Sequence, residues 1–426
     1  MLASWLWFSW HWVTALFNDP RRGAPLYAFF LGFLPLLLGS FATIWFFAGA
    51  IYALMMMVRG KLAARWPDGL SFVGLVVLSY FLSTLISPLA FANAPQGWLD
   101  VGTNLQFLIV VVLAIAMSQT PRTDVFDLFL WGLRAGAVAG FAFALFQVLM
   151  LGHLRAKGGM ANPIPFSNVA LLAGAMSLIG IGRLTGWQRL AALAAGLSGV
   201  GACLLSQTRG SLIALPLAAL ILGQHNFALI RAYPKRAALF LGVLIVTFVG
   251  LFVFIKLPDR FQILAQHLEE PQTVMNGDPS SSHRAILWTY GVRAIRDRPL
   301  GYGSQNAVDE VRRIAARDGY VVPPYTHLHN EFLTIGVGRG LIGLSLLILL
   351  LVAPIIMAWR SPQDGRYRDR LAFSLLLSSS YAVFGMTNVL FSQDQMITFF
   401  VSAYLILLLD ARRALGLPAK GRSSSP

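Results

Sequence analysis

The residues best suited to chemistry lie in a short stretch, YTHLHN, at positions 325–330. His327 and His329 stand there at the end of the longest polar stretch of the chain, and an apolar run follows directly. A neutral imidazole is a base near pH 7, so His329 could take a proton from a hydroxyl group. On sequence alone, a histidine that caps a helix or lies at a membrane interface would fit the same position.

Two arginines could hold an anion. Arg209 falls in a very short turn, SQTRGS, between two apolar runs, which keeps its guanidinium close to the membrane surface. Arg284 lies just after Ser281 and Ser282, and we expect it at the start of a helix, where free N–H groups also attract anions. A guanidinium grips a phosphate through two parallel hydrogen bonds. The alternatives are a snorkelling side chain for Arg209 and an ordinary surface arginine for Arg284.

A second group of polar residues, on the outer loops and beside His329, offers further positions for substrate binding. Its members are Arg155, Lys157, His327, Asn330 and Asn162. Arg134 is different, because it lies inside an apolar run about two turns from one end. We expect its side chain to snorkel to the membrane surface.

Other kinds of chemistry find little support. His327 and His329 could bind zinc together with His283, but an HxH pair is a weak metal signal, and we predict no metal site. The chain has neither a GxxxxGK[ST] phosphate loop nor an HExxH motif, and we predict no cofactor. No acidic residue falls in the middle of a predicted span, which argues against a carrier coupled to protons or sodium.

A membrane-embedded scaffold must position these residues. The 426-residue chain is 57% hydrophobic and only 12% charged, whereas a soluble domain is roughly one-quarter charged. Apolar runs long enough to cross a bilayer as helices recur from end to end, so we predict an all-α, polytopic integral membrane protein with about twelve transmembrane helices. The expected spans are 24–39, 41–58, 69–90, 102–118, 126–150, 166–182, 190–206, 211–223, 237–256, 330–357, 371–390 and 396–411.

The distribution of basic residues orients these helices. With the N-terminus in the cytoplasm, the inside segments collect most of the lysines and arginines, while the short outside loops hold only Arg155, Lys157 and Arg209. Both termini are therefore expected in the cytoplasm. The net charge of +15 then reflects topology and contact with membrane lipids, and no nucleic-acid partner is expected.

One long polar segment divides the chain. We predict a transmembrane bundle at 1–256, a partly helical outer loop at 257–328, further transmembrane helices at 329–411 and a basic cytoplasmic tail at 412–426. Within the loop, an amphipathic stretch at 257–268 precedes two expected helices, one that stops before Pro299 and one that ends at Gly319. The tryptophan-rich residues 1–17 are expected at the membrane interface, without a cleavable signal peptide.

Several of these segments resemble motifs of bacterial O-antigen ligases, the lipid A–core:surface polymer ligases. His329 and Asn330, followed by nine residues and then GLIG, resemble the signature H-[NSQ]-x9-G-x-x-G-T, with Leu344 in place of the usual threonine. SQTRGSLIAL resembles the S/T-R-G element of the superfamily, and NPIPFSNVALL is similar to its N-P…F/S-N stretch. HRAILWTYGVRAIRDRPLGYGSQN resembles its R-x3-W…P-hG-G-x-N block. The motifs run in the expected order from about residue 160 to residue 345.

The resemblance implies a glycosyltransferase of GT-C-like architecture in the inner membrane of a Gram-negative bacterium, active on the periplasmic face in lipopolysaccharide biosynthesis. Such an enzyme moves O-antigen from undecaprenyl pyrophosphate to a sugar hydroxyl of lipid A–core oligosaccharide, without metal or ATP and with inversion. Arg209 and Arg284 would bind the pyrophosphate, and His329 would be the general base.

Three alternatives stay open at this point. An O-antigen polymerase would use the same donor, and a protein O-oligosaccharyltransferase belongs to the same superfamily. From another class, a non-enzymatic transporter of lipid-linked glycan would also have many spans and basic residues, with His329 dispensable.

Overall fold

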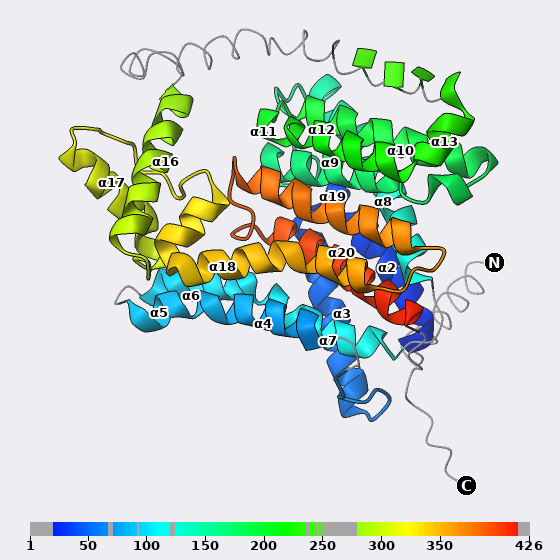
Figure 1. Ribbon diagram of the computed structural model, residues 1–426, viewed down its shortest axis with the longest axis horizontal. Coiled ribbons are helices and arrows are strands. Elements are labelled where there is room, and N and C mark those ends of the chain that lie inside the picture. Colours follow the sequence, from blue (N-terminus) through cyan, green and yellow to red (C-terminus); the bar gives the residue numbers. More distant parts are fainter. Residues whose placement is uncertain are drawn as a thin grey trace.

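Helices make up most of the computed structural model, and no strand occurs among the residues that it describes (Figure 1). These residues are 20–66, 71–91, 94–119, 124–235 and 279–415, with isolated positions between 238 and 249. The prediction of an all-α, polytopic membrane protein is confirmed. The predicted span at 237–256, the stretch at 257–268 and residues 1–17 lie largely or wholly outside the described ranges.

Each of the other predicted spans contains at least one helix. In chain order the helices are α2 (Pro20–Leu38), α3 (Ser40–Val58), α4 (Ser71–Thr84), α5 (Ile86–Ala90), α6 (Ala94–Asn104), α7 (Gln106–Met117), α8 (Val125–Leu149), α9 (Pro163–Ser177), η1 (Ile181–Arg183), α10 (Gly186–Leu205), α11 (Arg209–Leu212), α12 (Ala214–His225), α13 (Phe227–Ala232), α16 (Pro279–Asp297), η3 (Ser304–Asn306), α17 (Ala307–Arg317), α18 (Glu331–Arg360), α19 (Tyr367–Gly385) and α20 (Asp394–Ala414).

Seven helical segments in the described ranges are long and apolar enough to cross a membrane. They are Ser40–Val58, Ser71–Ala90, Gly97–Met117, Val125–Leu149, Gly186–Leu205, Glu331–Arg360 and Asp394–Ala414. The helices at the remaining described spans, α2, α9, α12 and α19, are shorter or more polar. The total number of spans therefore stays a prediction.

The helix α20 forms the centre of the bundle. Its most apolar window is 94% buried, against 39% for the longer helix α18. Around it, close helix contacts rely on small residues. Gly132 of α8 faces the backbone of Phe29 in α2 so closely that a Cβ atom would clash with the Phe29 carbonyl oxygen. Such small-residue contacts let membrane helices pack without side chains between them.

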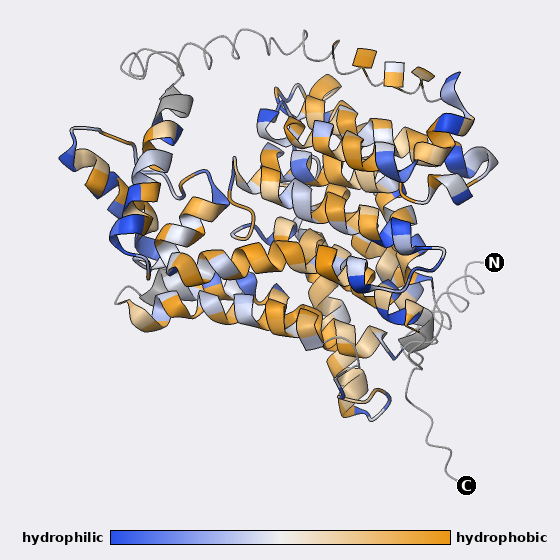
Figure 2. Ribbon diagram, in the orientation of Figure 1, coloured by the Kyte–Doolittle hydropathy of each residue, from blue (hydrophilic) through white to orange (hydrophobic). Residues whose placement is uncertain are grey.

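The long polar loop builds a second, smaller core. α16 and α17 lie together at one side of the bundle, and Figure 2 shows hydrophilic residues concentrated there and hydrophobic residues along α18. Their buried side chains join residues just before and within α18; the cluster includes Leu287, Tyr290, Val311, Ile314, Leu328 and Val337. α16 ends at Asp297 and α17 at Arg317, close to the predicted stops. The loop helices are thus packed onto the start of α18.

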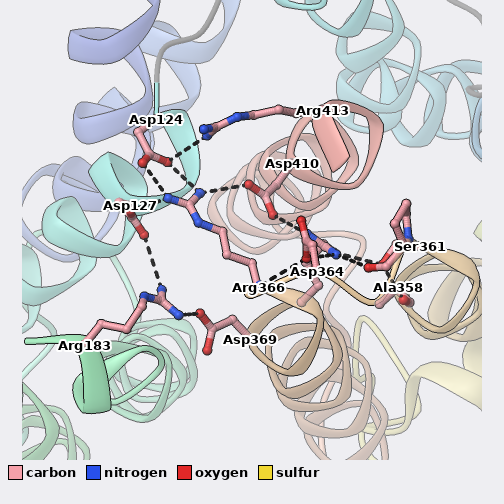
Figure 3. A network of polar contacts seen from close by, with 12 residues as sticks. Asp124, Asp127, Arg183, Ala358, Ser361, Asp364, Arg366, Asp369, Asp410 and Arg413 are labelled. Carbon is pink, nitrogen blue, oxygen red and sulfur yellow. Dashed lines mark hydrogen bonds and ion pairs between the residues drawn. The ribbon is translucent and has the colours of Figure 1, made fainter. Parts of the chain in front are cut away.

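The last three long helices give the bundle two distinct ends. α18 and α20 begin, and α19 ends, at what we call the histidine end, because His329 directly precedes α18. At the opposite end, the ion-pair end, Arg366 binds three carboxylates at 2.5 to 3.0 Å, those of Asp124, Asp127 and Asp410 (Figure 3). Arg370 is fully buried and shares Asp410 with Arg366. This network ties the start of α8 to the start of α19 and the end of α20.

Two predictions differ from the structure, one for the side chain of Arg134 and one for the loop between residues 90 and 102. Arg134 does not snorkel: it is only 4% exposed, and it donates to the carbonyl oxygens of Ser177 and Ile179 at 3.0 and 2.9 Å. The last carbonyls of a helix lack partners within it, so Arg134 is retained inside the bundle as the cap of α9. The predicted outer loop between 90 and 102 is also different, because most of it folds as the helix α6.

Candidate active site

His329 lies in a left-handed turn directly before α18, with a φ of 52°. Within the described ranges, Gln207 is the only other non-glycine residue with a positive φ. The backbone N–H of His329 donates to Nδ1 of His327 at 3.2 Å, and the two rings meet edge to face with centroids 4.3 Å apart. Strained backbone of this kind concentrates at functional sites.

The tryptophan of the R-x3-W block holds this turn from the side of α16. Trp288 Nε1 donates to the carbonyl oxygen of Leu328, the residue between the two histidines, at 3.0 Å. Tyr325 packs edge to face on His329 at 5.0 Å, and its hydroxyl lies 2.9 Å from Nδ1 of His283. The histidine turn is therefore fixed by residues from the loop and from α16.

Arg284 faces the same turn, because it lies one helical turn before Trp288 on α16. Partial burial, the neighbouring His327 and the positive charge of Arg284 together lower the pKa of His329 to about 4. Burial and Arg284 also lower the pKa of His327. Both imidazoles are therefore neutral at pH 7 and able to accept a proton or hydrogen bond.

The position of Arg284 in its helix differs from the prediction. α16 begins at Pro279, so Arg284 lies in the second turn and not at the helix start. Proline suits the first turn of a helix, which lets the following serines join the helix as well. The free N–H groups of a helix start therefore do not add to the charge of Arg284.

Two motifs far apart in the sequence combine to hold Arg209. The Thr208 hydroxyl donates to the carbonyl oxygen of Pro163 at 3.5 Å, and Ser211 donates to the side chain of Asn168 at 2.6 Å. The S/T-R-G element is thus bonded to the N-P…F/S-N stretch on both sides of Arg209. Arg209 itself is half-buried as the first residue of α11.

The turn after α19 lies between the two halves of the site. A Cβ atom added to Gly210, beside Arg209, would lie 2.6 Å from the Thr387 hydroxyl. On the other side, the Asn330 amide donates to the carbonyl oxygen of Met386 at 3.3 Å. The segments that carry Arg209 and His329 therefore flank the same turn.

The second group of predicted residues takes supporting positions. Arg155 donates to the Ser206 carbonyl oxygen at 2.9 Å and to the Thr208 hydroxyl at 3.2 Å, so it braces the turn before Arg209. The Lys157 backbone N–H donates to the side chain of Gln147. Asn162 and Asn330 each accept a backbone N–H and thereby cap a helix, α9 and α18 respectively.

A close backbone contact at Gly340 joins the polar loop to a kink in α18. Gly340 has a φ of 68°, and a Cβ atom there would clash with the Pro299 carbonyl oxygen. The N–H of Leu341 donates to that same oxygen at 2.8 Å, and the N–H of Tyr302 donates to Val337 at 2.8 Å. Only glycine accommodates this close backbone contact, which fixes α16 relative to the start of α18.

Sequence reasoning missed an ion pair of the buried Arg339, in the first half of α18. Arg339 is 4% exposed, and it binds Asp100 of α6 at 2.7 Å and lies over the Tyr80 ring. Nearby, Glu331 accepts the N–H of Leu390 at 2.5 Å. The signal was present, because a charge near the start of an apolar run is expensive and calls for a partner.

Neutral imidazoles, arginine-bearing segments and a packed polar loop thus lie at one end of a polytopic helical bundle, which defines the chain as an all-helical membrane protein with a polar site at that end. Residues 193–348 match the family model described as O-antigen ligase (Wzy_C), a region that includes Arg209, Arg284 and His329. This match agrees with the family that the motifs predicted, and it supports a ligase- or polymerase-type function in O-antigen processing. No curated protein matches the chain.

Proposed function

We propose that the protein is an O-antigen ligase of the Gram-negative inner membrane, which transfers a glycan from undecaprenyl pyrophosphate to a sugar hydroxyl of lipid A–core oligosaccharide. The observation that carries this proposal is the rigid turn of His329, whose imidazole is neutral beside Arg284. The family match supports the substrate class, and the charge pattern supports a site on the periplasmic face.

The transfer follows from the chemistry of these groups. The acceptor hydroxyl gives its proton to His329 while its oxygen attacks the anomeric carbon of the donor glycan. The bond from that carbon to the pyrophosphate oxygen breaks, and undecaprenyl pyrophosphate leaves with the electron pair. Attack opposite to the leaving group inverts the anomeric centre. Arg209 and Arg284 stabilise the negative charge that grows on the leaving pyrophosphate, in place of a metal ion.

The low pKa of His329 ties its basicity to the bound donor. In the free protein the imidazole is a weak base, because burial, His327 and Arg284 all disfavour its charged form. A pyrophosphate beside Arg284 offsets that positive charge and raises the pKa of His329. The base therefore strengthens when the donor is in place, and the imidazolium then passes its proton to water or to the released pyrophosphate.

Complementation of a ligase-null Gram-negative strain tests the proposal, with lipopolysaccharide examined on a gel. We expect the wild-type chain to restore the O-antigen ladder and His329→Ala to abolish it at equal membrane levels of the protein. His153→Ala is the matched control, because His153 lies on a different outer loop, and it should keep the ladder. A full ladder with His329→Ala would rule out His329 as the base.

The same strains separate the alternatives. A polymerase would lengthen single repeats in a polymerase-null strain and leave the ligase-null strain without a ladder. A transporter of lipid-linked glycan would support surface polymer with or without His329. Transfer by the purified protein in EDTA would support arginine as the pyrophosphate ligand, whereas loss on chelation and recovery with zinc would contradict it.

A further inference from the structure

The backbone of His329 needs a specific partner to hold its conformation. A residue with a Cβ atom pays a steric penalty in the left-handed region, so a φ of 52° requires compensating contacts. Trp288 fixes the Leu328 carbonyl, and Thr334 accepts the Leu328 N–H at 3.3 Å. These bonds hold the residue before His329, and neither of them engages the N–H of His329 itself.

His327 supplies the missing partner. Its Nδ1 accepts the His329 N–H at 3.2 Å, which is a side-chain bond to the backbone two residues later. Asparagine and aspartate form the same bond when they stabilise tight turns, and their Oδ1 occupies the place that Nδ1 takes in histidine. The bond requires Nδ1 to be unprotonated, and burial together with Arg284 keeps it so by lowering the pKa of His327.

Ring contacts of His329 with His327 and Tyr325 accompany the backbone bond. The His327 ring meets the His329 ring at 83°, with centroids 4.3 Å apart, and the Tyr325 ring meets it at 81°, with centroids 5.0 Å apart. The backbone bond and the two ring contacts together restrict the orientation of the His329 imidazole.

We propose that His327 is a positioning residue, which locks the left-handed turn through its Nδ1 atom and thereby aims the His329 imidazole at the acceptor hydroxyl. The role rests on the proposed ligase function. It differs from that of a second base or a substrate ligand, because what matters is a hydrogen-bond acceptor at one atom and not a titratable ring. An acceptor at the δ position of another side chain should therefore replace the histidine.

Three substitutions at one position test this role. His327→Asn keeps an acceptor at the δ position, His327→Phe keeps the ring without an acceptor, and His327→Gln moves the acceptor one atom farther out. We expect the Asn variant to keep at least about one-third of the wild-type kcat, while Phe and Gln lose on the order of 100-fold, as for a misaligned catalytic group. The KM for the lipid-linked donor should change little, because His327 does not bind it.

A readout without turnover separates this proposal from the ligase function. Carbethoxylation of His329 by diethyl pyrocarbonate, followed by mass spectrometry of the full-length protein, reports the exposure of its ring. We expect wild type and Asn to react at one rate and Phe and Gln at another, whichever reaction the protein catalyses. If all four proteins react alike, or if Asn is as impaired as Phe, the positioning role is wrong. Altered reactivity with no ligase activity in the wild type would overturn only the proposed function.

Discussion

At the ion-pair end, Arg370 is fully buried and binds Asp364 and Asp410 at 2.6 and 3.0 Å, whereas at the histidine end Arg284 lies beside the imidazoles of His327 and His329. The carboxylates of the first region already neutralise its arginines, so that region offers little to an incoming anion. The imidazoles of the second carry no charge at pH 7, because burial and Arg284 lower the pKa of both histidines. We therefore expect the ion-pair end to stabilise the fold and the histidine end to carry the proposed chemistry.

The His329→Ala variant tests the proposed role of the histidine end and should have the largest effect on activity. Loss of a general base costs about 10² to 10⁴-fold in rate. We expect kcat to fall by that amount in a purified assay, while the thermal unfolding temperature in detergent stays near that of wild type. A large fall in unfolding temperature together with activity would mean that His329 holds the fold.

The Arg370→Ala variant should show the opposite pattern. Breaking a buried ion pair costs up to about 3–5 kcal/mol. Here Arg366 still binds Asp410 and Asp364 is 43% exposed, so we expect a smaller cost from the loss of the fully buried Arg370. We expect a lower unfolding temperature in detergent and lower membrane yield, but near-normal turnover for each folded molecule. Arg368→Ala, an exposed arginine in the same helix, is the control and should change neither quantity. Lost turnover in well-folded Arg370→Ala would contradict the assignment.

The Arg284→Gln variant sharpens the role of charge at the histidine end. Removal of a preorganised donor to a developing anion costs about 10² to 10³-fold in rate. Wild-type kcat/KM should fall as the pH drops through about 4, where His329 becomes protonated. In the variant this fall should begin at higher pH, because one of the positive charges that lower the pKa of His329 is gone. Arg296→Ala, exposed on the same helix, should keep the wild-type profile.

The Gly340→Ala variant tests how firmly the loop is attached to the histidine end. A side chain at a φ of 68° costs about 1–3 kcal/mol in backbone strain, and its Cβ atom would displace the Pro299 carbonyl. We expect modest losses in both unfolding temperature and turnover. Gly102→Ala in α6 meets no atom within 4 Å and should be tolerated. Equal behaviour of the two variants would show that the kink does not need glycine.

Hydropathy was enough to predict most of the scaffold. Membrane helices are long apolar runs, and each predicted span that the structure describes contains at least one helix. Motif order also pointed to the family, which the match over 193–348 bears out. Helix starts were harder to predict, as at Pro279, because one proline moved Arg284 into the second turn of α16.

Contacts between residues that lie far apart in the sequence could not be predicted from local sequence patterns. Nothing in local spacing pairs Asp100 with Arg339, or Thr208 with Pro163, because helix packing decides which faces meet. Arg134 shows the same limit: the carbonyls that hold it belong to the end of another helix, α9. The roles of Arg209, Arg284 and His329 stay predictions, which the experiments above address.

The most direct test compares turnover per folded molecule for His329→Ala and Arg370→Ala in one preparation, with lipid-linked glycan as donor and lipid A–core as acceptor. The amount of folded protein is measured from the monodisperse elution peak in detergent, and the amount of product is measured by mass spectrometry. We predict that His329→Ala falls to about 1% of wild type or below, while Arg370→Ala stays within about twofold. Turnover by His329→Ala at the wild-type level would contradict the claim that the histidine end carries the chemistry.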